Sequence, residues 1–121
     1  INIWRMIVLQ IKLSRKGNTL IAKVTGEIDH HAAEYIRKKI DGETIKPTIK
    51  NLIFDFTHLS FMDSSGIGMI MGRYKNISRL NGKTAVVTNS SQIDRVLRMC
   101  GVQKFMNIYS NLDDAVRDFL N

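Results

Sequence analysis

The alternation of strand-like and helix-like segments constrains this chain more than any other feature. Residues 51–56 are rich in apolar side chains, which is typical of a strand covered on both faces. A helical apolar pattern follows over residues 65–80, and a further strand-like run covers residues 83–88. A strand, a helix and a strand in this order predict a crossover connection, which makes the two strands parallel.

The rest of the chain follows the same plan, in the order ββαβαβαβα. Residues 7–13 and 19–25 flank a turn and predict an antiparallel hairpin. The predicted helices span residues 30–40, 65–80, 91–100 and 112–120, and the remaining strands span residues 51–56, 83–88 and 105–109. The predicted fold class is α/β, with one domain and a mixed, mostly parallel five-stranded sheet whose first strand is an antiparallel edge.

Several helix ends carry recognisable signals. Asp29 is suited to cap the first helix, and Asp41-Gly42 is predicted to end it with Gly42 in the left-handed conformation. The segment Ser91–Asp94 resembles a capping box, with Asp in place of the more usual Glu. Ser110 or Asn111 is expected to cap the last helix.

Length and composition fit one globular domain. At 121 residues the chain is large enough for a single core, and we expect the domain to span residues 6–121, with residues 1–5 outside it. The single Cys100 excludes an internal disulfide and fits a reducing compartment. Because no apolar run is long enough for a bilayer and no export signal opens the chain, we expect a cytoplasmic protein.

The formal net charge of +7 has several interpretations. The simplest is a solvated basic surface, and an acidic protein partner or an anionic membrane is also compatible with it. Nucleic acid is disfavoured, because the lysines and arginines are scattered and do not alternate with aromatic residues.

The junction at residues 59–68 is the most informative stretch for function. Two serines follow Asp63 at the predicted start of a helix. Free backbone N–H groups and the positive end of the helix dipole favour a negative group at such a position. The sequence therefore predicts that Ser64 carries a phosphate in one functional state and is bare in the other.

Two catalytic alternatives fit this junction poorly. A nucleophile elbow around Ser64 would need Gly in place of Met62 and a His later in the chain, but all three histidines precede Ser64. A dinucleotide fingerprint beginning at Gly66 would need a third Gly where Met71 stands. We therefore expect neither a serine hydrolase nor a nucleotide-binding enzyme.

The glycines of the junction have structural interpretations instead. Gly66 is predicted to let the backbone turn tightly, and Gly68 and Gly72 to let the helix lie close to the sheet. Each glycine inside a helix costs about 1 kcal/mol relative to alanine, so either close packing or the approach of a partner must compensate.

Polar residues also follow the second predicted strand. Adjacent helical residues such as His30 and His31 point in different directions, so no metal site is expected there. Asp29 and Asp63 each follow a strand, and the carboxyl ends of parallel strands share one edge of a sheet. Each Asp is suited to be a helix cap, and their joint placement also predicts a shared recognition surface. Its members are Asp29, His30, His31, Asp63, Ser64, Ser65 and Gly66.

Two segments carry a family resemblance. Residues 25–31, Thr-Gly-Glu-Ile-Asp-His-His, and residues 59–68, Leu-Ser-Phe-Met-Asp-Ser-Ser-Gly-Ile-Gly, resemble the anti-sigma factor antagonists, which are STAS-domain proteins. The continuation at residues 71–75, Met-Gly-Arg-Tyr-Lys, strengthens the resemblance. The double histidine after Asp29 is similar to the sporulation branch of that family more than to its general-stress branch.

The resemblance implies a regulatory role and no catalytic activity. It implies that the unphosphorylated domain binds an anti-sigma factor that is also a serine kinase, which frees a sigma factor. The kinase would phosphorylate Ser64 and end the binding, and a PP2C-type phosphatase would restore the domain. ATP and magnesium would belong to the kinase, so no cofactor, metal, membrane or direct nucleic-acid contact is expected. The alternative is a general-stress or stressosome-type STAS regulator with a different kinase.

The resemblance also implies a set of site residues. The phosphorylation site is Ser64. The implied partner-binding residues are Gly26, Glu27, Asp29, His30, His31, Asp63, Ser64, Ser65, Gly66 and Arg73.

Overall fold

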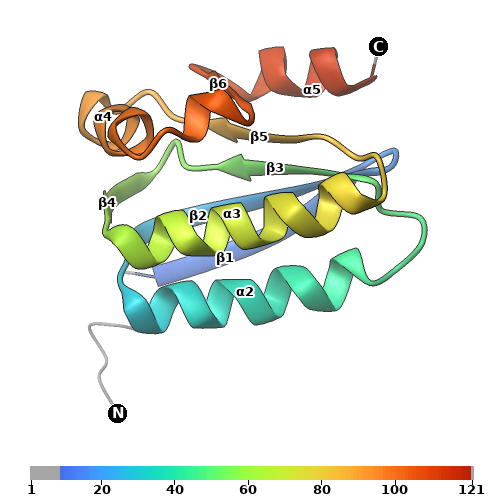
Figure 1. The fold of residues 1–121 in the computed structure, drawn as a ribbon, viewed down its shortest axis with the longest axis horizontal. Helices are drawn as coiled ribbons and strands as arrows, with labels where there is room; N and C mark the ends of the chain where they lie inside the picture. Colours follow the sequence, from blue (N-terminus) through green and yellow to red (C-terminus); the bar gives the residue numbers. More distant parts are fainter. Residues whose placement is uncertain (1–8, 121) are drawn as a thin grey trace.

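The computed structural model describes residues 9–120 as a sheet with helices on both faces (Figure 1). The strands run in the order β1-β2-β3-β5-β6, and β4 pairs with β2 off this path. The elements are β1 (Leu9–Lys16), β2 (Thr19–Ile28), α2 (His30–Thr44), β3 (Asn51–Asp55), β4 (Leu59–Met62), α3 (Ser64–Arg79), β5 (Thr84–Val87), α4 (Ser91–Met99), the short 3-10 helix η1 (Val102–Lys104), β6 (Asn107–Tyr109) and α5 (Leu112–Leu120).

The sheet confirms the predicted mixed topology. β1 and β2 pair antiparallel along the whole of β1, and all other pairs are parallel. β2 is ten residues long and takes two successive partners on its other side. β3 pairs with its first half, Thr19–Lys23, and β4 with its end, Gly26–Ile28. The length of β2 therefore allows both strands to share one neighbour.

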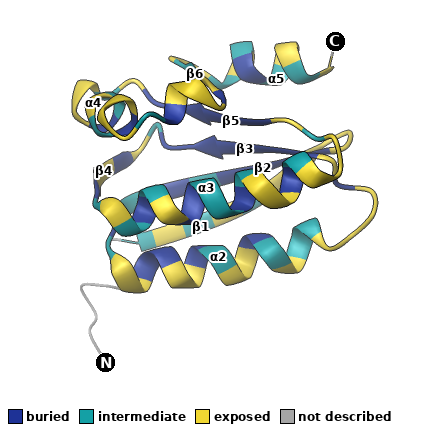
Figure 2. Cartoon of the chain, viewed as in Figure 1, coloured by how far each residue is buried: buried dark blue, intermediate teal, exposed yellow. Residues whose placement is uncertain are grey.

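The two faces of the sheet have separate cores. Leu52 and Phe54 of β3 belong to a large cluster with α2, α3 and α4, whereas Ile53, between them, packs with α5. The alternation of side chains along a strand explains this division. All five residues of β3 are buried, as predicted for a strand covered on both faces (Figure 2).

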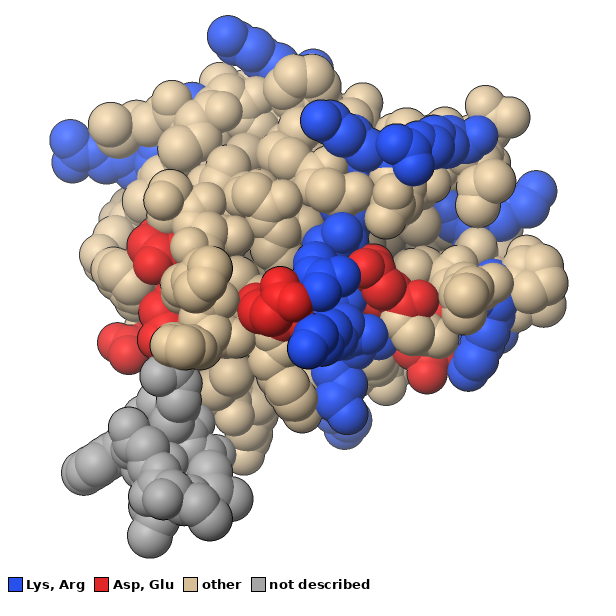
Figure 3. Space-filling view, turned by 60° about the horizontal axis from the view of Figure 1, so that its bottom comes forward, with Lys and Arg blue, Asp and Glu red and all other residues tan. Residues whose placement is uncertain are grey.

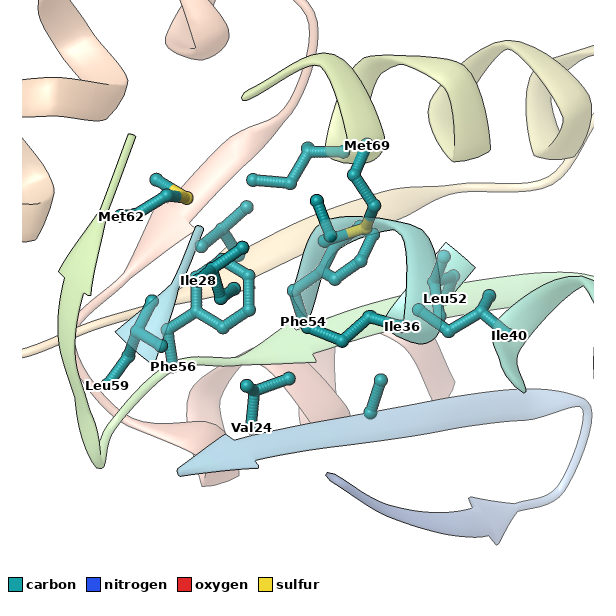
Figure 4. Packing of buried hydrophobic residues seen from close by; sticks show 14 of the residues in the cluster. Val24, Ile28, Ile36, Ile40, Leu52, Phe54, Phe56, Leu59, Met62 and Met69 are labelled. Atoms are coloured by element: carbon teal, nitrogen blue, oxygen red, sulfur yellow. The ribbon is translucent and has the colours of Figure 1, made fainter. Parts of the chain in front are cut away.

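The larger cluster fixes α2 and α3 against the sheet. Ile36 and Ile40 of α2 are fully buried, and Met69 of α3 is nearly so. Figure 4 shows these side chains converging on Phe54. The Phe54 and Phe56 rings lie 5.6 Å apart between centroids, within the range of favourable aromatic pairs. Both helices therefore have well-defined positions above the central strands.

The structure adds one strand that the sequence did not predict. β4 occupies Leu59–Met62, within the junction that precedes α3. Its pairing with β2 shifts register, with Gly26 opposite Leu59 and Glu27 opposite Phe61. Ser60 is therefore an extra residue in a bulge, and the burial pattern of β4 does not alternate. A segment of four residues without alternating buried and exposed side chains gives no sequence signal for a strand.

Other boundaries also differ from the prediction. The helix α2 continues past Asp41-Gly42 to Thr44, and Gly42 does not take the left-handed conformation. A single glycine is tolerated inside a helix at a cost of about 1 kcal/mol, so its presence did not mark an end. Residues 105–106 are not in a strand, because η1 precedes a shorter β6. Residues 1–8, which include the predicted extension and the start of the first strand, lie outside the described residues.

The caps of α4 and α5 lie at or next to the predicted positions. Ser90, one residue before the predicted capping box, caps α4 by accepting a hydrogen bond from the Ile93 N–H at 3.3 Å. Asn111 caps α5, as one of the two predicted candidates, by accepting from the Asp114 N–H at 2.9 Å.

Between residues 9 and 120, no helix is both long enough and apolar enough to cross a membrane.

Gly82 provides a test of the packing between α3 and β5. A Cβ built on Gly82 would lie 1.8 Å from the Lys50 backbone oxygen, which cannot move as a side chain can. We expect Gly82→Ala to lower the free energy of unfolding by about 1–3 kcal/mol. Gly42→Ala is the control, because its Cβ meets nothing within 4 Å, and it should raise stability by about 0.5–1 kcal/mol. Urea denaturation of both variants measures the difference, and equal midpoints would contradict this account.

Candidate functional site

The pairing of β2 with β4 brings two helix starts together. Ile28, the last residue of β2, is paired with Met62, the last residue of β4. The Asp63 N–H donates to the Ile28 carbonyl oxygen at 3.2 Å. α2 and α3 follow these strand ends almost at once and run side by side from the same edge of the sheet (Figure 1).

Asp29 and Asp63 cap these two helices, as the sequence predicted. The Asp29 carboxylate accepts from the Ala32 N–H at 2.9 Å, and the Asp63 carboxylate accepts from the Ser65 N–H at 2.9 Å. Both residues have extended backbones, with φ of −97° and −99°. Each carboxylate therefore has a structural role and also places negative charge at the shared edge of the sheet.

Ser64 and Ser65 differ in their surroundings. Ser64 is the first residue of α3 and is exposed, whereas Ser65 is half-buried. In the part of the chain that the structure describes, the Ser64 hydroxyl makes no hydrogen bond, so it is accessible to another molecule. The positive end of the α3 dipole lies beside it.

The glycines of the junction have other roles than those predicted. Gly66 is buried without a positive φ, and a Cβ on it would lie 2.3 Å from Cγ of Met62. It is therefore required by close approach to β4 and not by a tight turn. Gly68 and Gly72 do not bring α3 close to the sheet, because a Cβ on either would meet nothing within 4 Å among residues 9–120. Of the two predicted explanations for these glycines, close packing is wrong.

The end of β2 and the start of α2 contribute the second part of the site. Gly26 has a φ of 111°, donates its N–H to the His58 carbonyl oxygen and accepts from the Ser60 hydroxyl at 3.0 Å. Glu27, His30 and His31 are exposed, and the two imidazole rings meet edge to face with centroids 5.9 Å apart. Within residues 9–120, no group of three His, Cys, Asp or Glu side chains is placed to hold a metal ion.

Arg73 lies apart from the other predicted partner-binding residues. It is buried between α3 and α2, where its Nε lies 2.8 Å from Oδ1 of Asp41 and its Nη1 donates to the Met69 carbonyl oxygen at 3.3 Å. Burial lowers the pKa of the Arg73 guanidinium, and the Asp41 carboxylate opposes that shift.

A groove of about 310 Å³ separates α2 and α3 next to Ser65. Its lining residues are His30, Ala33, Glu34, Arg37, Ser65, Gly68, Met69 and Arg73. Charges of both signs meet over α2 (Figure 3), where Arg37 bridges Glu34 at 2.5 Å and Asp41 at 3.4 Å. The sequence analysis missed Glu34 and Arg37, although their three-residue spacing on one helix is a signal that they share a face.

Comparison with known proteins identifies the family. The family model for the STAS domain matches residues 10–115. The anti-sigma F factor antagonist of Paenibacillus polymyxa is 36% identical over 110 residues, which cover 91% of this chain and 94% of that protein. The solved structure of unphosphorylated SpoIIAA, an anti-sigma factor antagonist, superimposes with a TM-score of 0.72 at 28% identity, covering 93% of this chain and 96% of that one.

A second solved structure is of the phosphorylated form of a relative. The Bacillus cell fate determinant SpoIIAA in that form superimposes with a TM-score of 0.73 at 30% identity, covering 90% of this chain and 98% of that one. The sheet order and the capped helix starts of this chain are consistent with its similarity to these proteins. The chain belongs to the STAS domain family.

Proposed function

We propose that this chain is an anti-sigma factor antagonist of the sporulation type, switched by phosphorylation of Ser64. The observation that carries the proposal is the exposed Ser64 hydroxyl at the start of α3, beside the Asp63 cap and the loop that begins α2. The bare form binds an anti-sigma factor that is also a serine kinase, and this frees a sigma factor. The names of the relatives that match along most of this chain support the same role.

Electrostatics accounts for the switch. Phosphorylation adds about −1.5 to −2 charges at neutral pH. In the free protein the N-terminus of α3 accepts this charge with little rearrangement. Against a docked partner the same phosphate is repelled by acidic or phosphate groups, and the adjacent Asp63 increases the negative charge. About 3 kcal/mol of repulsion weakens binding by more than a hundredfold, so the fold need not change.

In this proposal the chain is a substrate and not an enzyme. The kinase supplies ATP and magnesium, and a PP2C-type phosphatase removes the phosphate, so the domain needs no cofactor of its own and acts in the cytoplasm. The surface that faces the kinase is formed by the two helix starts. Its proposed members are Gly26, Glu27, Asp29, His30, His31, Asp63, Ser64, Ser65 and Gly66.

Gly68 fits the same surface. It lines the groove between α2 and α3 next to Ser65, and among the described residues no atom outside its own helix turn lies within 4 Å of a Cβ built on it. Since close packing within the chain does not explain this glycine, the approach of a partner is the remaining explanation for its cost in helix stability.

Phosphate transfer tests the central proposal. With ATP and the cognate anti-sigma kinase, the wild-type chain should gain one phosphate, whereas Ser64→Ala should gain none, and mass spectrometry distinguishes the two. Ser91→Ala is the matched control, because Ser91 is the exposed first residue of α4 and lies outside the proposed surface, and it should be phosphorylated like wild type. Phosphate on Ser64→Ala would move the site to Ser65, and ATP hydrolysis by the chain alone would contradict the absence of catalysis. Transfer by a general-stress kinase and not a sporulation kinase would favour the alternative branch.

A fixed negative charge tests the switch itself. Ser64→Asp should bind the anti-sigma factor at least tenfold more weakly, because it brings part of the phosphate charge into the interface. Ser91→Asp is the matched control, since Ser91 is the exposed first residue of α4 and gains the same charge at another helix start. Calorimetry should show wild-type affinity for the control. Wild-type affinity for Ser64→Asp would count against the charge mechanism.

Gly68→Ala separates stability from binding. We expect the variant to gain about 1 kcal/mol of stability, because alanine favours the helix and its Cβ meets nothing within 4 Å in the described part of the chain. Its affinity for the anti-sigma factor should fall about tenfold, because the methyl group enters the space that the partner uses. The control Gly42→Ala should gain stability and keep full affinity. If both variants keep full affinity, the partner does not approach Gly68.

A further inference from the structure

We propose that Arg73 is a positioning residue that fixes α2 relative to α3 through Asp41 and does not itself touch the partner. The proposal rests on the proposed function, because the surface that Arg73 would hold in place is the one assigned to the anti-sigma factor. It replaces the role that the resemblance implies for Arg73, which is direct contact with the partner.

The burial of Arg73 favours an internal role. Of the lysines and arginines between residues 9 and 120, Arg73 alone is buried. Its side chain is 10% exposed, compared with 39% for Arg37 in the same groove. The guanidinium makes two contacts, one with Asp41 of α2 and one with the Met69 carbonyl oxygen one turn earlier in α3. A side chain held in this way has little freedom to reach an incoming protein.

The ion pair joins the two helices far from their starts. Arg73 lies nine positions after Ser64, roughly 14 Å along α3 at about 1.5 Å per residue. At the other end, the pairing of Ile28 with Met62 already joins the strands that lead into the helices. Within residues 9–120, no other ion pair connects α2 to α3. The ion pair therefore adds a direct link between the two helices to the apolar cluster that holds both of them on the sheet.

The ion pair links α2 and α3 where their direct packing against each other is incomplete. The groove separates the helices beside Ser65, and Gly68 and Gly72 contribute no side chain to fill it. Without the ion pair, α2 could rotate about its own long axis, which would move His30 and His31 at its start relative to Ser64. Arg37 cannot replace this link, because its two carboxylate partners, Glu34 and Asp41, lie on its own helix.

The first test uses the free protein and needs no partner. Arg73→Met and Asp41→Asn should shift the amide resonances of His30 and His31 in the same direction, and Arg73→Lys should restore them towards wild type. Arg79→Met is the matched control, because Arg79 is exposed and, among residues 9–120, its side chain bonds only to Asn76 of its own helix. Unchanged His30 and His31 resonances in a folded Arg73→Met or Asp41→Asn protein would overturn the proposal.

The second test measures affinity for the anti-sigma factor in a double-mutant cycle. Arg73→Met and Asp41→Asn should each weaken binding about tenfold, and the double variant should bind no more weakly than either single variant. Loss of affinity in Arg73→Met alone, with Asp41→Asn unchanged, would show direct contact and overturn the proposal. If the wild-type chain binds no anti-sigma factor, the proposed function fails, and the resonances of the free protein still decide the role of Arg73.

Discussion

The parallel pairing of β2 with β4 is the contact on which the rest of the site depends. β2 is long enough to pair first with β3 and then with β4, so two helices can begin from adjacent strand ends. Side chains that are more than thirty positions apart in sequence, such as Asp29 and Asp63, therefore follow directly paired residues. The bulge at Ser60 belongs to this arrangement, because it sets the register that places Ile28 opposite Met62.

The residues between the strand ends and the helix starts of the site have two roles. Asp29 and Asp63 satisfy backbone N–H groups of α2 and α3 and so stabilise the fold. The same carboxylates define the electrostatic environment of Ser64. Under the proposed function, a substitution at either position would change folding and recognition together, whereas Ser64 makes no internal hydrogen bond within the described residues.

The sequence was sufficient for the overall plan because its signals are local and periodic. The hairpin, the parallel crossovers, the caps at Asp29 and Asp63, and their common edge all follow from such signals. What it could not predict depends on contacts between distant residues. The bulge in β4 removes the alternation that would have revealed this strand in the sequence. Gly42 does not set the end of α2. The burial of Arg73 depends on Asp41, which lies in another helix. The open space beside Gly68 likewise depends on how α2 and α3 lie relative to each other, which the sequence pattern of a single helix does not show.

The separation of the two cores has a consequence for how such a domain can evolve. α5 packs on Ile21, Ile53 and Val87, on the opposite face of the sheet from α2 and α3. Substitutions beneath α5 can therefore adjust thermal stability, and with it protein abundance, while the helices around Ser64 keep their geometry. A lineage can adapt to a hotter or colder habitat through one face of the sheet and retain the proposed partner surface on the other.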